Sequence, residues 1–244
     1  MIRLSVLGTL RVATATTVED STLLGQPKLL ALLLFLVVAR PQGFHQRDRL
    51  LGLFWPELGQ EQARAALRKA LHRLRQSFGD EIIASAGQDA VSVPVHTRGC
   101  DVDDFETAVA AGRFGEALDH YRGELAPGLY VAGAPAFEQW LSGERARLQE
   151  TAMTAAWQVV ERLANASEFT NASRVARRVA RLANGDERVV CKVMTMLARL
   201  GDRAGAVRVY RQFELQLWEE LQMRPTATAA ALMQGIAADG MAPS

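Results

Sequence analysis

Residues 60–78 read QEQARAALRKALHRLRQSF, and the remainder of the chain is best understood as the scaffold for this segment. Its apolar side chains recur at i, i+4, i+7 and i+11, as in a helix that buries one stripe: Leu67, Leu71, Leu74 and Phe78. The opposite arc is cationic, and no acidic residue interrupts it between Gln62 and Gly79. Surface helices usually mix charges of both signs to gain i,i+4 ion pairs. The one-sided charge therefore favours a helix that faces nucleic acid over a solvated surface helix.

The net charge of the chain is small, but it differs between the N-terminal and C-terminal parts. The 244 residues include 28 Lys and Arg against 27 Asp and Glu, a net charge of +1, so the molecule as a whole is no general polyanion binder. Residues 1–97 hold 11 basic against 8 acidic side chains, a net of +3, whereas residues 98–244 hold 17 against 19, a net of −2. The basic character thus lies in the front part of the chain.

Several classes of protein are disfavoured. Cys100 and Cys191 lie far apart, with no CxxC pair and no His at metal-ligand spacing, so we expect free thiols and no metal site. The N-terminus lacks the pattern of a signal peptide, and the longest apolar run, residues 29–39, is too short to cross a bilayer. No acid/base pair or nucleophile motif is apparent. We therefore expect a cytoplasmic protein that is not an enzyme, needs no cofactor and makes no membrane contact.

The front part reads as a small sheet followed by helices and a hairpin. Alternating apolar residues from Ile2 to Val12 predict a half-buried strand, and Leu23 and Leu24 predict a second, short one. Helices are expected over residues 29–40, 45–55 and 60–78, and a hairpin over 82–85 and 91–95. This is the order of a winged helix-turn-helix with an extra N-terminal antiparallel sheet. In that fold the third helix enters the major groove, which is roughly 12 Å wide.

The rear part reads as all-helical from Asp101 onward. Short breaks at Gly and Pro separate the expected helices: 103–111, 114–122, 136–163, 169–182, 187–200, 203–221 and 226–236. Turns such as residues 112–117 and 201–206 are typical of tetratricopeptide-like hairpins of about 34 residues. We therefore predict an α+β winged helix-turn-helix over residues 1–97, an all-α tetratricopeptide-like repeat domain over 101–236, and a tail over 237–244.

Two sets of residues resemble a known family of bacterial regulators. The first resembles the winged-helix domain of the antibiotic regulatory protein (SARP) type of activator: LFWP at 53–56, Ala63-Arg64-x-x-Leu67 and Leu71-x-Arg73-Leu74-Arg75. The second resembles the bacterial transcriptional activator domain that accompanies it: DVDDFE at 101–106, YRG at 121–123, Trp140 with Glu144-Arg145-x-Arg147-Leu148, and EEL at 219–221 with Pro225. The resemblance covers nearly the whole chain. Three features depart from the pattern: a wing tip without Lys or Arg at 87–90, Gln222 where a Gly is usual, and Asn184-Gly185 in place of an Asp-Pro turn.

The resemblance implies a sequence-specific activator that binds double-stranded DNA at direct repeats near promoters and contacts RNA polymerase holoenzyme. It also allows self-association on tandem repeats. Larger members append a nucleotide-binding or phosphopeptide-binding module. This chain has no G-x-x-x-x-G-K-[ST] motif, so it resembles the two-domain form or a fragment that holds those domains.

Eight side chains are candidates for DNA contact. The four farthest from the apolar stripe are expected in the groove, where they can bond to base edges: Arg68, Lys69, His72 and Arg73. Four others are expected to bind phosphates, from helix N-termini or from the edges of the stripe: Lys28, Arg47, Arg64 and Arg75. The alternatives are phosphate contact for Arg68 and Arg73, core-edge packing or pairing with nearby acids for Arg64 and Arg75, and plain solvation for Lys28 and Arg47.

Two rival hypotheses remain open. In the first, the chain is a tetratricopeptide-type adaptor for protein–protein contacts, and the winged helix is a docking surface. It should then bind no random duplex even at low salt. In the second, the chain is a fragment of a longer ATP-driven regulator whose gene continues past Ser244. A cluster of Arg174, Arg177, Arg178 and Arg181 in the rear part is expected to be a solvated helix face, with a polymerase or DNA contact as the alternative.

Overall fold

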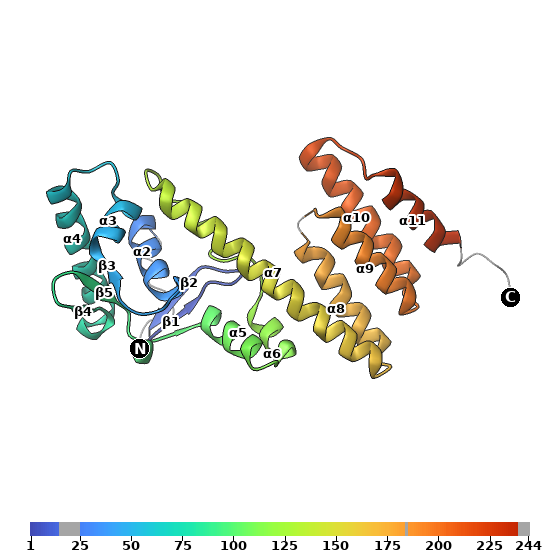
Figure 1. Ribbon diagram of the computed structural model, residues 1–244, viewed down its shortest axis with the longest axis horizontal. Helices are drawn as coiled ribbons and strands as arrows, with labels where there is room; N and C mark the ends of the chain where they lie inside the picture. The colour runs from blue at the N-terminus through green and yellow to red at the C-terminus, as the bar shows by residue number, and fades with distance from the viewer. Residues whose placement is uncertain (15–24, 184, 239–244) are drawn as a thin grey trace. The chain divides into compact units, whose positions relative to one another are not determined.

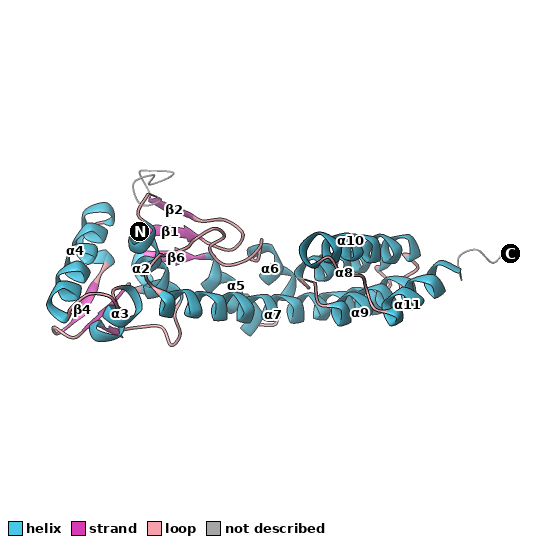
Figure 2. Cartoon of the chain, turned by 90° about the horizontal axis from the view of Figure 1, so that it is seen from above, coloured by secondary structure: helices cyan, strands magenta, loops and turns pink. Residues whose placement is uncertain are grey.

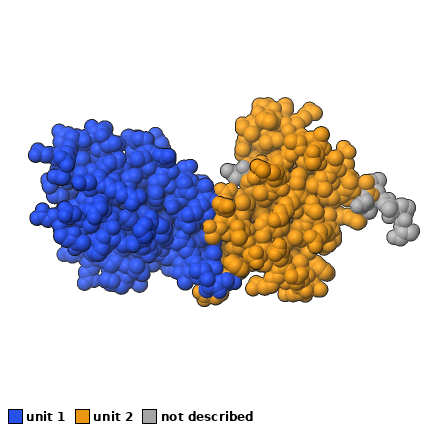
Figure 3. All heavy atoms as spheres, viewed as in Figure 1, with its two compact units in different colours: residues 1–112, 119–148 blue, residues 113–118, 149–244 orange. Residues whose placement is uncertain are grey.

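The computed structural model describes residues 1–14, 25–183 and 185–238. It divides into two compact units, which Figure 3 distinguishes by colour: residues 1–112 and 119–148 form unit 1, and residues 113–118 and 149–244 form unit 2. The strand expected at Leu23 and Leu24 lies outside the described residues, as do residues 239–244 of the expected tail. Figure 2 shows the described strands gathered in unit 1, whereas unit 2 is helical.

A three-stranded sheet begins unit 1, with β1 (Ile2–Ser5) between β2 (Arg11–Thr14) and β6 (Arg98–Cys100). Strand β1 pairs antiparallel with β2 and parallel with β6. The single strand expected over Ile2 to Val12 is wrong, because the chain turns after β1 and returns as β2. Gly8 lies in this turn with φ +80°, and a Cβ there would lie 2.7 Å from the backbone of Arg122. The position therefore requires glycine.

Three helices follow the first hairpin: α2 (Pro27–Val38), α3 (Arg47–Phe54) and α4 (Gln60–Phe78). Helix α2 is buried from Leu29 to Val38, as its apolar sequence predicts, and forms the centre of unit 1. Pro27 occupies its first turn, where no intrahelical N–H is needed. Helix α3 begins two residues later than expected, because His45 and Gln46 form strand β3 (His45–Gln46) instead.

A second small sheet forms the wing, with the order β3-β5-β4. Strands β4 (Ala84–Ala86) and β5 (Ala90–Ser92) make the expected hairpin, although it is shorter than predicted because residues 80–82 form the 3-10 helix η1 (Asp80–Ile82). A second short 3-10 helix, η2 (Val95–Thr97), leads from the wing into β6. The backbone N–H of Arg47 donates to the carbonyl of Asp89 at 2.7 Å, which fixes the wing tip beside the start of α3.

An aromatic cluster joins the helix-turn-helix to residues that come much later in the chain. Phe137 and Trp140 belong to the first part of α7 (Pro135–Asn165), within unit 1. The ring of Phe35 in α2 lies 4.7 Å from that of Trp140, and the ring of Phe54 in α3 lies 5.1 Å from that of Phe137. Phe35, Phe54 and Phe137 are fully buried. Unit 1 therefore has one hydrophobic core that includes the start of α7.

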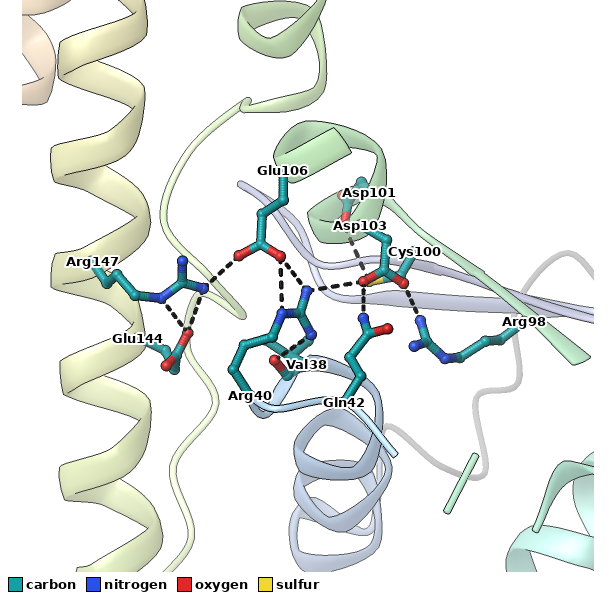
Figure 4. Close-up of polar contacts among 10 residues, drawn as sticks. All are labelled: Val38, Arg40, Gln42, Arg98, Cys100, Asp101, Asp103, Glu106, Glu144 and Arg147. Carbon is teal, nitrogen blue, oxygen red and sulfur yellow. Dashed lines mark hydrogen bonds and ion pairs between the residues drawn. The ribbon is translucent and has the colours of Figure 1, made fainter. Parts of the chain in front are cut away.

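A polar network reinforces this arrangement (Figure 4). It links the segment after α2 to α5 (Asp101–Ala110) and α7 through charged side chains: Arg40, Arg98, Asp103, Glu106, Glu144 and Arg147. Nearby, the buried carboxylate of Asp101 accepts hydrogen bonds from the backbone N–H groups of Val6 and Leu7 at 2.9 to 3.0 Å. Burial raises the pKa of Asp101, and these hydrogen bonds oppose the shift.

Unit 2 includes most of α6 (Phe114–His120) and the second part of α7. Four further helices pack on one another in chain order (Figure 1): α8 (Phe169–Leu182), α9 (Glu187–Arg199), α10 (Arg203–Leu221) and α11 (Ala227–Ala238). Asp186 and Asp202 cap α9 and α10 by accepting backbone N–H groups. Helix α10 ends at Gln222, which adopts φ +55°, and its backbone and side-chain N–H groups both donate to the carbonyl of Trp218. Gln222 thus closes the helix in a left-handed conformation that glycine adopts more readily.

The fold class predicted from the sequence, a winged helix-turn-helix followed by a tetratricopeptide-like helical domain, is confirmed. Within the described part of the chain, no helix is both long and apolar enough to cross a membrane.

Candidate nucleic-acid interface

Helix α4 has the amphipathic structure that its sequence predicts. Ala63, Leu67, Leu71 and Leu74 are buried against the core, and Phe78 is half-buried at the end of the stripe. The helix ends at Gly79, whose φ of +95° suits glycine and turns the chain toward the wing. The apolar stripe therefore fixes the rotation of α4 and leaves the cationic arc outward.

The basic side chains of α4 lie where the one-sided charge predicts. Five of them are exposed: Arg64, Arg68, Lys69, His72 and Arg73. The sixth, Arg75, is half-buried and donates from Nη2 to the backbone carbonyl of Ile83 at 3.3 Å. Arg75 therefore serves the junction between α4 and the wing.

A hollow of about 500 Å³ lies between α4, the start of α3 and the wing tip, and we call it the wing hollow. Its lining contains the cations Arg47, Arg64 and Arg68 together with Asp48 and Asp89. Arg64 lies 3.7 Å from Asp48, measured between Nη2 and Oδ1. The Nε atom of Arg47 is buried and has no hydrogen-bond partner among the described residues. Because three arginines line it, the wing hollow is suited to an anionic oxygen.

A second hollow, of about 300 Å³, lies on the other side of α4 beside the start of α2, and we call it the α2 hollow. Its cations are Lys28, Lys69 and Arg73, and Trp55 contributes an apolar wall. The ammonium of Lys28 lies 5.8 Å from the ring centroid of Trp55, within the range of a cation–π contact, and 3.4 Å from Glu57 Oε1. Arg73 donates from Nη1 to Gln26 Oε1 at 2.6 Å.

The structure thus brings together seven of the eight predicted side chains on three neighbouring helices. Arg47, Arg64 and Arg68 share the wing hollow, Lys28, Lys69 and Arg73 share the α2 hollow, and His72 lies exposed on α4. Arg75 is directed to the wing instead. The sequence did not point to Gln26, Asp48 or Asp89, because their proximity to the cations arises only from the packing of α2, α3 and the wing against α4.

The second basic cluster, on α8, is partly occupied by contacts within unit 2. Arg177 pairs with Asp202, and Arg178 donates to the carbonyl of Leu118 at 2.6 Å. Arg174 and Arg181 are exposed. Two of the four arginines therefore hold helices together, and the expectation of a uniformly solvated face is wrong for Arg177 and Arg178.

Comparisons with known proteins agree with this architecture. A solved structure of Mycobacterium tuberculosis EmbR in complex with a low-affinity phosphopeptide shares the fold, with a TM-score of 0.59 and 22% sequence identity over 98% of this chain. The chain spans 65% of the length of that protein. A search among curated proteins found no match. Residues 97–237, more than half of the chain, match the model of the bacterial transcriptional activator domain. The resemblance to SARP-type regulators is therefore confirmed, and the chain belongs to the bacterial transcriptional activator domain family.

Proposed function

We propose that this chain is a sequence-specific DNA-binding transcriptional activator, active in the cytoplasm, that inserts α4 into the major groove. Residues 1–97 carry the DNA contacts, and residues 101–236 provide the helical domain that contacts other proteins. The role is one of binding and not of catalysis. The observation that carries the proposal is the pair of cationic hollows on opposite sides of the exposed face of α4.

The spacing of these features suits duplex DNA. A helix with its side chains is about 10–12 Å across, which matches a major groove roughly 12 Å wide. When α4 lies in the groove, the two sugar-phosphate walls run along its flanks, beside the wing hollow and the α2 hollow. Each hollow also contains the first turn of a helix, α3 at Arg47 and α2 at Lys28, whose positive dipole end favours phosphate.

The wing contributes differently from the helix. Its tip reads Gly-Gln-Asp-Ala at 87–90 and contains no Lys or Arg to enter a minor groove. Asp89 instead bonds through its carbonyl to the Arg47 backbone. In this proposal the wing therefore shapes the wing hollow around a phosphate and leaves base recognition to α4.

The remaining parts of the proposal, which concern the DNA repeats and the protein partners, rest on membership of the family. Activators of this type are expected to bind direct repeats near promoters, to self-associate on those repeats and to contact RNA polymerase holoenzyme. A reconstituted transcription reaction on a promoter with the selected repeats tests this part. Added protein should increase the transcript yield, and unchanged yield despite bound DNA would refute activation.

DNA binding is tested first with a fluorescent random duplex at low and moderate salt, followed by selection from a random pool. We expect binding to any duplex at low salt, weakened steeply by added salt, and tighter binding to a tandem motif. Absence of binding at low salt would overturn the proposal and favour the protein-interaction adaptor.

A further inference from the structure

A line of side chains runs down the middle of the exposed face of α4, and we call it the midline. Its members are spaced at i, i+4, i+7, i+11 and i+15: Glu61, Ala65, Arg68, His72 and Gln76. All five are exposed. At 100° per residue they fall within a sector of about 80° on the side of the helix away from the buried leucines. The midline therefore lies within the exposed face of α4, and Lys69 lies beside it on the side of the α2 hollow.

The midline side chains differ in their contacts from three of the cations beside them. On one border, Arg64 pairs with Asp48 and Arg75 donates to Ile83; on the other, Arg73 donates to Gln26. These three cations are held sideways by the protein, toward the flanks of the helix. By contrast, none of the midline side chains has a hydrogen-bond or ion-pair partner among the described residues.

We infer that the midline determines the DNA sequence that this protein selects, an inference that rests on the proposed insertion of α4 into the major groove. Arg68, His72 and Gln76 supply the hydrogen bonds to base edges, and the Ala65 methyl group supplies an apolar contact. Arg73 is held beside the α2 hollow by its bond to Gln26, and Lys69 lines the same hollow, so both are assigned to the phosphate wall. Both were expected from the sequence to lie in the groove. Arg68 keeps its expected role in base reading although it also lines the wing hollow, and Gln76 joins the residues that read bases.

The chemistry of these side chains limits the bases they can select. Arginine pairs bidentately with guanine, glutamine pairs bidentately with adenine, and a methyl group packs against the methyl of thymine. From Ala65 to Gln76 the helix rises about 16 Å at 1.5 Å per residue, equivalent to about five base pairs at 3.4 Å each. We therefore expect a half-site of about five base pairs that contains a guanine opposite Arg68 and an adenine toward the end opposite Gln76.

The test is selection from a random duplex pool with the full chain, three variants and one control variant, followed by affinity measurement on the selected and on random duplexes. Gln76→Ala should lose the preference at one position and weaken binding to the selected duplex by about 5- to 150-fold, with random duplexes bound as before. Gln76→Glu should change the preferred base at that position from adenine to cytosine. Arg73→Ala should weaken binding to all duplexes alike and leave the selected motif unchanged.

The outcomes separate the two proposals. Failure of the unmodified chain to bind any duplex at low salt would overturn DNA binding and the midline together. Normal binding with an unchanged motif in both Gln76 variants, or a changed motif in Arg73→Ala, would overturn the midline alone. Gln139→Ala, an exposed glutamine of α7 in the same unit, is the matched control and should retain both motif and affinity. Circular dichroism of each variant verifies that the helices remain folded.

Discussion

Arg40, just after α2, donates from Nε to one carboxylate oxygen of Glu106 in α5 at 3.0 Å, and Arg147 of α7 donates to the other oxygen at 2.7 Å. One carboxylate, only 24% exposed, thus bonds to guanidinium groups from the helix-turn-helix and from α7. Asp103 and Glu144 supply second partners for the same two arginines (Figure 4). The helix-turn-helix and the first helices of the activator domain are therefore bound to each other within unit 1.

Replacing Glu106 by glutamine tests the strength of this junction. Glu106→Gln preserves the shape but removes the charge that both arginines share, so we expect the free energy of unfolding of unit 1 to fall by about 1–3 kcal/mol. Urea unfolding followed by tryptophan fluorescence measures the change. Asp104→Asn is the control, since its pair with Arg3 is more exposed and should contribute no more than about 1 kcal/mol. Equal losses in the two variants would contradict a special role for Glu106.

We expect a larger loss of stability when the aromatic cluster is disrupted. Phe137 is fully buried against Phe54, so Phe137→Ala should destabilise unit 1 by about 3–5 kcal/mol and lower its midpoint of thermal unfolding. DNA affinity should then fall at temperatures where the variant begins to unfold, although Phe137 lies 59 positions after α4 ends. Tyr130→Ala, at a side chain that is 67% exposed, should change stability by less than about 0.5 kcal/mol.

Truncation tests whether the residues proposed to carry the DNA contacts can fold without the residues that follow them. A fragment of residues 1–97 lacks β6, the Asp101 carboxylate that binds two backbone N–H groups, and the rings of Phe137 and Trp140. We expect this fragment to unfold without cooperativity, whereas a fragment of residues 1–148 should show a cooperative thermal transition. Circular dichroism and amide NMR dispersion compare the two. A well-folded 1–97 fragment would show that the later residues are dispensable for the core.

Local patterns in the sequence predicted the helices well. Both ends of α4 were predicted correctly, because the apolar stripe is regular and Gly79 stops it. The helices of unit 2 agree with the predicted ranges within about three residues at each end, a deviation expected for helix boundaries. Gly and Pro mark most of these boundaries, so the ends of the helices can be located from the sequence alone.

The errors arise where a distant segment decides the structure. The alternation of Ile2 to Val12 continues through Gly8, so only the close approach of the Arg122 backbone reveals the turn. Strand β6 reads Arg-Gly-Cys, which has no strand pattern, and it forms because β1 offers a free edge. The contacts of Phe35 and Phe54 with α7 likewise cannot be predicted from the residues next to them in the sequence. The cations of α4 were identifiable from the sequence, but the side toward which each one points depends on Gln26, Asp48 and the wing.

The two cysteines should differ in reactivity. Burial, together with the neighbouring carboxylates of Asp101 and Asp103, raises the pKa of the Cys100 thiol to about 12. Its thiolate fraction at pH 8 is then about 10⁻⁴, so alkylation is slow. Cys191 is partly exposed, and although burial also raises its pKa, iodoacetamide should modify it first. Mass spectrometry of peptides after timed alkylation measures both rates, and in urea the two should become similar. Faster reaction of Cys100 in the folded protein would show that the β6 region opens.

Arg47 provides the most direct test of the phosphate contacts. Its side chain lines a hollow that also contains Arg64 and Arg68, and its buried Nε has no partner among the described residues. A phosphate in this hollow would pair with the guanidinium of Arg47, so we expect Arg47 to contribute more to DNA affinity than a surface cation that is already paired. If about four to six cations contact phosphates, the plot of log affinity against log salt should have a slope of roughly −4 to −5.

Arg47→Met keeps the length of the side chain and removes its charge. The slope should become less steep by about 0.9, and affinity for random and selected duplexes should fall in parallel. Thermal stability should stay equal or rise, because the variant no longer buries an unpaired N–H. Arg113→Met, at an exposed cation of unit 2 whose partner is Glu116, is the control and should leave the slope unchanged. An unchanged slope in Arg47→Met, in a variant that remains folded, would mean that no phosphate enters the wing hollow.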